Sequence, residues 1–89
     1  MKAIMTVTGL DHPGILAAVA DALAANHANV LNISQTIMDE YFTMIVEIEF
    51  DESNVTVHDI QRSMTKAGEE ARLVIRVQAE DLFRAMNRL

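Results

Sequence analysis

Four stretches of the chain alternate hydrophobic and polar residues, which is the pattern of a β-strand with one buried face. They cover residues 2–8, 29–38, 42–50 and 72–78. In the first stretch the hydrophobic set is Ala3, Met5 and Val7. Asp39-Glu40 separates the second stretch from the third, so we expect these two strands to form an antiparallel hairpin with a short turn.

Two longer stretches repeat hydrophobic residues at the spacing of an α-helix. The first helix is expected to run from about Pro13 to His27 and is rich in alanine, which favours helix. The second is expected to begin after Thr56, which opens a capping-box sequence, and to end at Gly68. A third, short helix is expected to close the chain, with the hydrophobic positions Leu82, Phe83, Met86 and Leu89.

The order of these elements is βαββαβ followed by one helix. Right-handed crossovers then place both main helices on one face of a four-stranded antiparallel sheet, with the first and third strands central and the other two at the edges. We therefore predict an α+β fold, a ferredoxin-like βαββαβ sandwich with a short C-terminal helix, in one domain over residues 1–89. The opposite face of the sheet is expected to be largely wet. Its polar positions are Lys2, Thr6, Ser34, Thr43, Glu47, Glu49, Arg72 and Arg76.

Composition limits what such a domain can be. Hydrophobic residues make up 51% of the chain but aromatic residues only 4%, so aliphatic side chains and methionine must fill a small core. The chain has no cysteine, which excludes a disulfide scaffold, a thiolate metal site and a cysteine nucleophile. It shows no apolar run of membrane-spanning length and no signal peptide. We expect a soluble, cytoplasmic protein that does not bind membranes.

The charge is acidic and uneven. The net charge of −6 argues against a nucleic-acid partner, because binding phosphate requires clustered lysine and arginine. Residues 1–59 contain one basic and nine acidic residues, whereas residues 60–89 contain six basic and four acidic ones. This asymmetry fits either ordinary solvated faces or complementary contact between subunits or with a partner.

The sequence offers no catalytic or metal-binding arrangement. The three histidines, His12, His27 and His58, have no metal-ligand spacing. The acidic stretch at residues 51–54 is expected to be a solvated turn rather than a calcium loop. A metallochaperone of this topology would need two thiols in its first loop, a small phosphatase would need an arginine there, and an RNA-binding sheet would need exposed aromatic residues on its central strands. We therefore expect neither an enzyme nor a cofactor.

Two segments resemble the signature of ACT domains. Residues 9–16 read G-L-D-H-P-G-I-L, and residues 28–33 read A-N-V-L-N-I at the start of the second strand. In ACT domains a D-x-P-G-hydrophobic loop precedes the first helix and an asparagine element opens strand two. The run from residue 32 to residue 44 is similar to the small free-standing ACT proteins of bacteria and archaea. The resemblance implies regulation in response to an amino acid, exerted here through a separate enzyme or regulator.

The resemblance and the residues together suggest one ligand site. The candidate residues are Asp11, His12, Pro13, Gly14, Ile15, Leu16, Asn29 and Val30. The N–H groups at the start of the first helix suit a carboxylate. Asp11 suits an ammonium group, and the Asn29 amide can both donate and accept. The alternative reading is that Asp11 or His12 only caps the helix and Asn29 only opens the strand.

We expect the site to lie between subunits. A small core and an edge strand at residues 29–38 without proline favour a homodimer or a higher, even-numbered oligomer. ACT domains commonly pair side by side, and the corresponding loop and asparagine positions bind ligand in them. If two copies of the second strand pair antiparallel, Asn29 of one copy approaches the first loop of the other. The alternative function is an interaction module that binds a protein partner and no small ligand.

Overall fold

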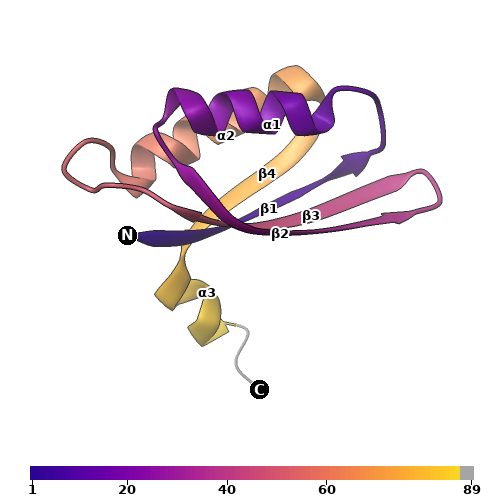
Figure 1. Ribbon diagram of the computed structural model, residues 1–89. Coiled ribbons are helices and arrows are strands. Elements are labelled where there is room, and N and C mark those ends of the chain that lie inside the picture. The colour runs from indigo at the N-terminus through magenta and orange to yellow at the C-terminus, as the bar shows by residue number, and fades with distance from the viewer. Residues whose placement is uncertain (87–89) are drawn as a thin grey trace.

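The computed structural model describes residues 1–86 as two layers, with two helices packed on one face of a four-stranded sheet (Figure 1). The strands are β1 (Lys2–Leu10), β2 (Asn29–Met38), β3 (Tyr41–Glu49) and β4 (Leu73–Ala79), and the helices are α1 (Ile15–Ala25), α2 (Val57–Ala71) and α3 (Glu80–Met86). The strand order is β2-β3-β1-β4, and every neighbouring pair is antiparallel. The predicted ferredoxin-like fold is confirmed, including its central and edge strands and the short third helix.

The core lies between the sheet and the two main helices. Alternate residues of β1, β3 and β4 point toward the helices, as the hydrophobic alternation predicts. The buried set comprises Ala3, Met5, Val7, Ile15, Val19, Leu23, Phe42, Met44, Val46, Ile48, Phe50, Ile60, Met64, Leu73, Ile75 and Val77. Within the described residues no polar or charged residue is buried. Of the stripe predicted for the third helix, Leu82 is exposed, Leu89 lies outside the described residues, and so do the side chains of Phe83 and Met86.

Helix α1 is shorter than the sequence predicted. It begins at Ile15 because Gly14 adopts a left-handed conformation, with φ 87°, which cannot continue into a helix. At the other end Ala25 is the last helical residue, and His27 has φ 55°. The prediction of a helix from about Pro13 to His27 was therefore wrong by two residues at each end, and both errors come from backbone turns.

Helix α2 begins as predicted and ends later. The Thr56 hydroxyl accepts a hydrogen bond from the Asp59 N–H at 3.1 Å, and the Asp59 carboxylate accepts one from the Thr56 N–H at 3.0 Å. This pair forms the expected capping box. Gly68 does not end the helix. A side chain there would meet the Leu73 carbonyl oxygen at 2.7 Å, so glycine instead lets α2 pack closely against β4. The helix ends at Arg72, whose φ is 61°.

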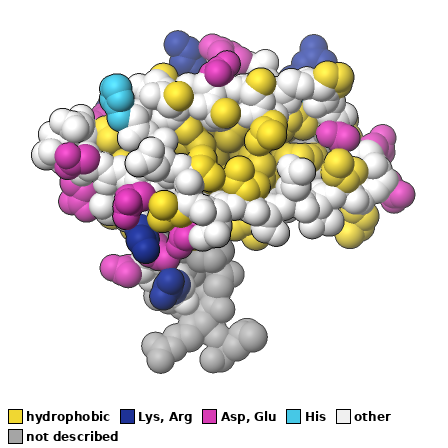
Figure 2. All heavy atoms as spheres, in the orientation of Figure 1, with side chains coloured by type: hydrophobic (Ala, Val, Ile, Leu, Met, Phe, Trp, Pro, Cys, Tyr) yellow, Lys and Arg dark blue, Asp and Glu magenta, His cyan; other side chains and the backbone are white. Residues whose placement is uncertain are grey.

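Strand β2 is an edge strand whose residues are all exposed. Val30, Ile33 and Ile37 pair with β3 residues whose side chains are buried under the helices, so they point to the same side of the sheet. The helices nevertheless leave them uncovered. Leu31 lies at the bulge between Val30 and Asn32. These four residues, Val30, Leu31, Ile33 and Ile37, are 40–56% exposed, and we call them the β2 edge surface. Figure 2 shows hydrophobic side chains gathered over the region between α1 and β2.

The described helices include none that is both long enough and apolar enough to cross a lipid bilayer.

Candidate functional site

The loop between β1 and α1, residues 11–14, is held in place by two neighbouring elements. The Asp11 N–H donates to the Glu40 carbonyl oxygen at 2.7 Å, which fastens the loop to the turn of the β2–β3 hairpin. The half-buried His12 ring places Nε2 2.7 Å from the Ala71 carbonyl oxygen at the end of α2. The loop therefore has a fixed position at one end of the sheet, while the Asp11 side chain is exposed to solvent.

His12 has a positioning role that the sequence did not indicate. Its Nδ1 lies 3.0 Å from the Pro13 carbonyl oxygen, so both ring nitrogens face acceptors. A neutral imidazole has one N–H and can donate to only one of the two carbonyls, whereas a charged ring can donate to both. The ring thus lies between the carbonyls of Pro13 and Ala71, and its contact with Ala71 joins the loop to α2.

The start of α1 has no side-chain cap, which excludes the reading that Asp11 or His12 is the cap. The Ala18 N–H bonds to the Gly14 carbonyl at 2.9 Å, so the N–H groups before Ala18 are those that a helix leaves without an internal partner. Around the position of a Gly14 side chain no atom lies within 4 Å apart from those of the adjoining residues. Ile15 is buried and anchors the turn, whereas Leu16 is 53% exposed beside it.

Asn29 and Val30 lie at the opposite end of the sheet from this loop. Asn29 pairs with Glu49, which pairs with Lys2 at the start of β1, whereas the loop follows Leu10 at the other end of the same strand. At about 3.4 Å per residue, eight steps separate the two ends by roughly 27 Å. One copy of the chain therefore does not bring the eight candidate residues together. The residues form two groups at opposite ends of the sheet, which we call the two half-sites of the candidate ligand site.

The half-site at Asn29 faces a shallow hollow of about 300 Å³. Its lining residues are Met1, His27, Asn29, Glu49, Phe50 and Asp51. Asn29 is exposed, and within the described part of the chain no hydrogen bond engages its amide. The amide is therefore available to a ligand or to another chain.

The acidic turn beside this hollow is occupied by its own hydrogen bonds. One Asp51 carboxylate oxygen accepts from the Ser53 hydroxyl at 2.7 Å and from the Ser53 N–H at 2.9 Å. These bonds hold the pKa of Asp51 below its usual value. The Asn54 N–H bonds to the Asp51 carbonyl at 3.0 Å and closes the turn. The segment has the geometry of a turn, as the sequence indicated.

A groove between the two main helices was missed by the sequence reasoning. Its volume is about 540 Å³, and it is lined by Ala18, Asp21, Ala22, Ala67, Glu70 and Ala71. Alanines spaced four residues apart on both helices lie along it, and small side chains on facing helices leave such a groove. The spacing was visible in the sequence, but the facing of the two helices was not.

Comparisons with known proteins agree on one family. An ACT domain family model matches residues 2–78. A UPF0237 protein of Corynebacterium efficiens is 56% identical over 87 residues, which is 98% of each chain. A UPF0237 protein of the archaeon Methanopyrus kandleri is 40% identical over 88 residues, covering 99% of this chain and 98% of its own. A solved structure of an ACT domain protein from Streptococcus pneumoniae superposes with a TM-score of 0.81 at 36% identity and covers 93% of both chains.

The match extends through both half-sites and through the whole βαββαβ unit. The resemblance noted in residues 9–16 and 28–33 is thus confirmed by independent comparison. The chain belongs to the ACT domain family, a family of regulatory ligand-binding modules.

Proposed function

We propose that the protein is a cytoplasmic, non-catalytic regulatory module that binds an amino acid or a similar zwitterion between two paired copies and then acts on a separate enzyme or regulator. The observation that carries this proposal is the start of α1, where Gly14 is left-handed and no side chain caps the helix. A helix start in this state suits a carboxylate.

The β2 edge surface supports pairing of two copies. An exposed edge strand offers unpaired N–H and C=O groups to another strand. Here the strand also carries four exposed apolar residues on or near the side of the helices. Antiparallel pairing of β2 with its copy would satisfy the backbone groups and cover those side chains together. The resulting dimer would contain one continuous sheet of eight strands.

The same pairing would complete the ligand site. Antiparallel pairing sets the start of one β2 beside the end of the other, so Asn29 approaches Met38 of the second copy and the adjoining hairpin turn. The Asp11 N–H bond to Glu40 keeps the β1–α1 loop against that turn. Each half-site of one copy would then face the complementary half-site of the other, and a dimer would hold two equivalent sites.

Different residues at this junction would bind the two charged groups of a zwitterion. The N–H groups of Gly14, Ile15 and Leu16 would bind the carboxylate, and the exposed Asp11 carboxylate would bind the ammonium group. Asn29 can bind either group, because its amide both donates and accepts. Pro13 fixes the turn, and His12 holds it against α2. Val30 and Leu16 would contribute apolar contact with the side chain of the ligand.

We predict that Asp11→Ala and Asn29→Ala each weaken amino-acid binding by about tenfold or more, because each removes a polar partner of a buried ligand group. Isothermal titration calorimetry of the wild type against the twenty amino acids identifies the ligand, and the same titration is then run on each variant. Matched controls are Asp21→Ala on α1 and Thr65→Ala on α2, both exposed and outside the two half-sites. Neither control should change the affinity.

The outcomes separate the two candidate functions. Unchanged affinity in both Asp11→Ala and Asn29→Ala would place the ligand elsewhere on the protein. An absence of heat with every amino acid, from a wild type that is folded and paired, would instead favour a module that binds a protein and no small ligand. Bound ligand should also raise the melting temperature of the wild type, since it binds the paired state alone.

A further inference from the structure

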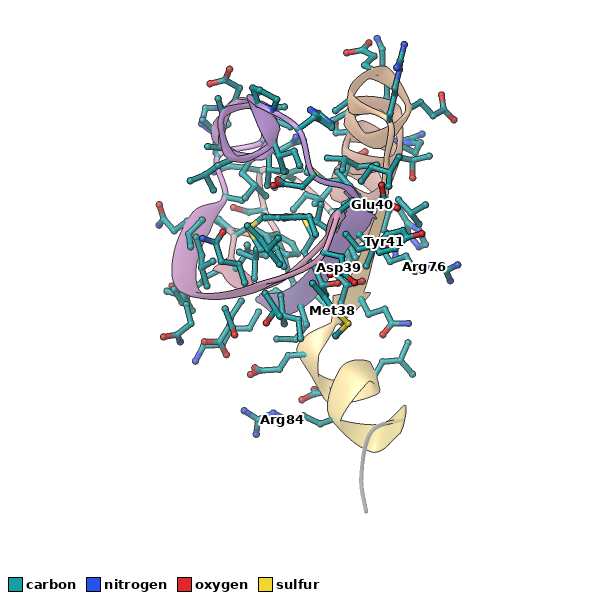
Figure 3. All side chains as sticks on the ribbon, turned by 90° about the vertical axis from the view of Figure 1, so that its right-hand side faces the viewer. Met38, Asp39, Glu40, Tyr41, Arg76 and Arg84 are labelled. Carbon is teal, nitrogen blue, oxygen red and sulfur yellow. The ribbon has the colours of Figure 1, made fainter. Side chains whose placement is uncertain are left out.

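The sheet ends in two edge strands, β2 on one side and β4 on the other. Figure 3 shows α2 lying over β4, whereas β2 is at the far side of the sheet. Each edge strand has a row of backbone N–H and C=O groups turned away from the sheet, and another strand can bond to them if nothing covers them. Which of these two edges is covered therefore decides how copies of the chain can join.

The hydrogen bonds at the start of β1 determine which backbone groups of β4 face outward. The Met1 amine donates to the Phe50 carbonyl oxygen at 2.9 Å, and the Phe50 N–H donates to the Met1 carbonyl oxygen at 3.0 Å. In an antiparallel sheet such mutual pairs recur at every second residue, and the residues between them bond to the strand on the other side. The odd-numbered residues of β1 therefore bond to β3 and the even-numbered ones bond to β4, since neither pairing has a register shift.

Helix α2 covers this edge of β4 at two points. The β4 residues that pair with odd-numbered residues of β1 turn their backbone groups to the free edge, and they are Leu73, Ile75, Val77 and Ala79. The Gln61 side-chain amide donates to the Val77 carbonyl oxygen at 2.8 Å. The Leu73 carbonyl oxygen lies so close to Gly68 that a Cβ on this glycine would be 2.7 Å away. Gln61 and Gly68 are about two helical turns apart, so α2 runs along the free edge.

Strand β2 has no such cover. The even-numbered residues of β3 bond to β1, so its odd-numbered residues bond to β2. The β2 residues between those pairs turn their backbone groups outward, and they are Ile33, Gln35 and Ile37. Among residues 1–86 no side-chain hydrogen bond reaches these groups. The sheet is thus closed at β4 and open at β2.

We infer that Gln61 closes the β4 edge to strand pairing and so confines edge-to-edge association of the chain to β2. A strand added at β4 needs the Val77 carbonyl oxygen as an acceptor, and the Gln61 amide already occupies it. Association through one edge alone ends at two copies, whereas association through both edges has no natural end. The limit of two copies rests on the β2 pairing proposed above. The closure of β4 does not, because it follows from contacts within one chain.

Gln61→Ala and Gln61→Met test the closure. Alanine removes the donor and most of the side chain, and methionine keeps the side-chain length but cannot donate. We expect the mass in solution of each variant to be at least double that of the wild type, because the Val77 carbonyl becomes available to a second strand. Sedimentation velocity measures the mass, and circular dichroism verifies that each variant is folded. Thr65→Ala, at an exposed position on α2, is the matched control and should keep the wild-type mass.

Hydrogen–deuterium exchange locates the new contact. The outward N–H groups of residues 73–79 should exchange more slowly in the enlarged assembly than in the wild type, because a partner strand then bonds to them. A lower melting temperature alone would be the result of a structural role for Gln61. The inference is overturned if both folded variants keep the wild-type mass, or if the mass rises without slower exchange in residues 73–79.

Ile33→Lys separates this inference from the proposed pairing through β2. If β2 pairs as proposed, Gln61→Ala combined with Ile33→Lys should stop at two copies, joined through β4. If β2 does not pair, the wild type is a single copy, and Gln61→Ala alone should stop at two copies. Either result supports the closure of β4 by Gln61. A mass that Gln61→Ala leaves unchanged in both backgrounds contradicts it, whatever the state of β2.

Discussion

Gly14 and Gly68 are both needed as glycine, for different physical reasons. At Gly14 the backbone is left-handed and a side chain would meet no neighbour within 4 Å. The cost of replacing it is therefore conformational. At Gly68 the cost is steric, because a side chain would lie 2.7 Å from the Leu73 carbonyl oxygen. Only Gly14 belongs to a proposed half-site, and its requirement for glycine is explained by the turn itself.

We predict that Gly14→Ala lowers the free energy of unfolding by about 1–2 kcal/mol, while Gly14→Asn lowers it less, because asparagine tolerates the left-handed region. Urea denaturation of both variants measures the difference. The control is Gly68→Ala, which should cost more than either because β4 or α2 must shift. Equal losses in Gly14→Ala and Gly14→Asn would show that the backbone conformation is not the reason for glycine at this position.

At the scale of single elements, the sequence predicted those features of the fold that local residue patterns determine. Alternation located all four strands, and the capping box located the start of α2. The errors at the ends of α2 and β1 fall where tertiary contacts decide, whereas those of α1 come from the backbone turns at Gly14 and His27. The last turn of α2 continues past Gly68 because β4 packs against it, and β1 continues to Leu10 because Tyr41 and Phe42 of β3 are there to pair. No local pattern carries that information.

The candidate site also has one part that the sequence predicted and another part that it did not. The motif in residues 9–16 indicated the loop and the helix start, and the structure gives them a fixed geometry. The contact of His12 with Ala71 joins residues 59 positions apart, so no spacing rule could find it. The assignment of Asp11 and Asn29 to a ligand stays a prediction. It rests on how two copies pair, and a single sequence does not specify this.

The capping box of α2 gives a prediction about pH. Hydrogen bonds from Thr56, above all from its backbone N–H, hold the pKa of the Asp59 carboxyl below its usual value of 3.8, and the Arg62 guanidinium adds to this. A lowered folded-state pKa means that this stabilisation is present above pH 3.8 and is lost as the pH falls through the folded-state pKa.

We expect Thr56→Ala to lower the free energy of unfolding by about 1 kcal/mol at neutral pH, as loss of an N-cap does. Its loss of stability between pH 5 and pH 3 should stay close to that of the wild type, because alanine keeps the backbone N–H that is the main cause of the lowered Asp59 pKa. Asp59→Asn, which removes the carboxylate, should make that loss shallower. Thermal unfolding followed by circular dichroism across this range tests both parts. Thr65→Ala, at an exposed position inside α2, should show neither effect. Parallel acid curves for the wild type and Asp59→Asn would contradict the assignment.

The whole molecule exposes apolar residues on both sides of the sheet. The β2 edge surface lies on the helix side, and Met38, Tyr41, Leu10, Val74 and Ile45 lie on the opposite side. A chain with a core of this size gains stability by burying such residues against another chain. The even-numbered oligomer expected from the sequence stays a prediction.

Ile33→Lys sets a charge in the middle of the β2 edge surface. We predict that it prevents pairing through this surface, so that the mass of the variant in solution is about half that of the wild type. Amino-acid binding should be lost with it, because each site needs both copies. Multi-angle light scattering gives the mass, and calorimetry gives the binding. Thr65→Lys on α2 is the matched control and should change neither. Full affinity in an Ile33→Lys protein that no longer pairs through β2 would show that one copy holds a complete site.

The separation of the two half-sites by the length of β1 has a genetic consequence. If the ligand site is shared between two copies as proposed, a chain that lacks Asp11 would still supply Asn29 to its neighbour, and a chain that lacks Asn29 would still supply the loop. Two inactive alleles of this kind would therefore complement each other inside one cell. If they mix freely, half of the pairs are mixed and each mixed pair has one intact site, so about one quarter of all sites recover. A dominant defect is expected only from a substitution that damages both ends of the chain at once.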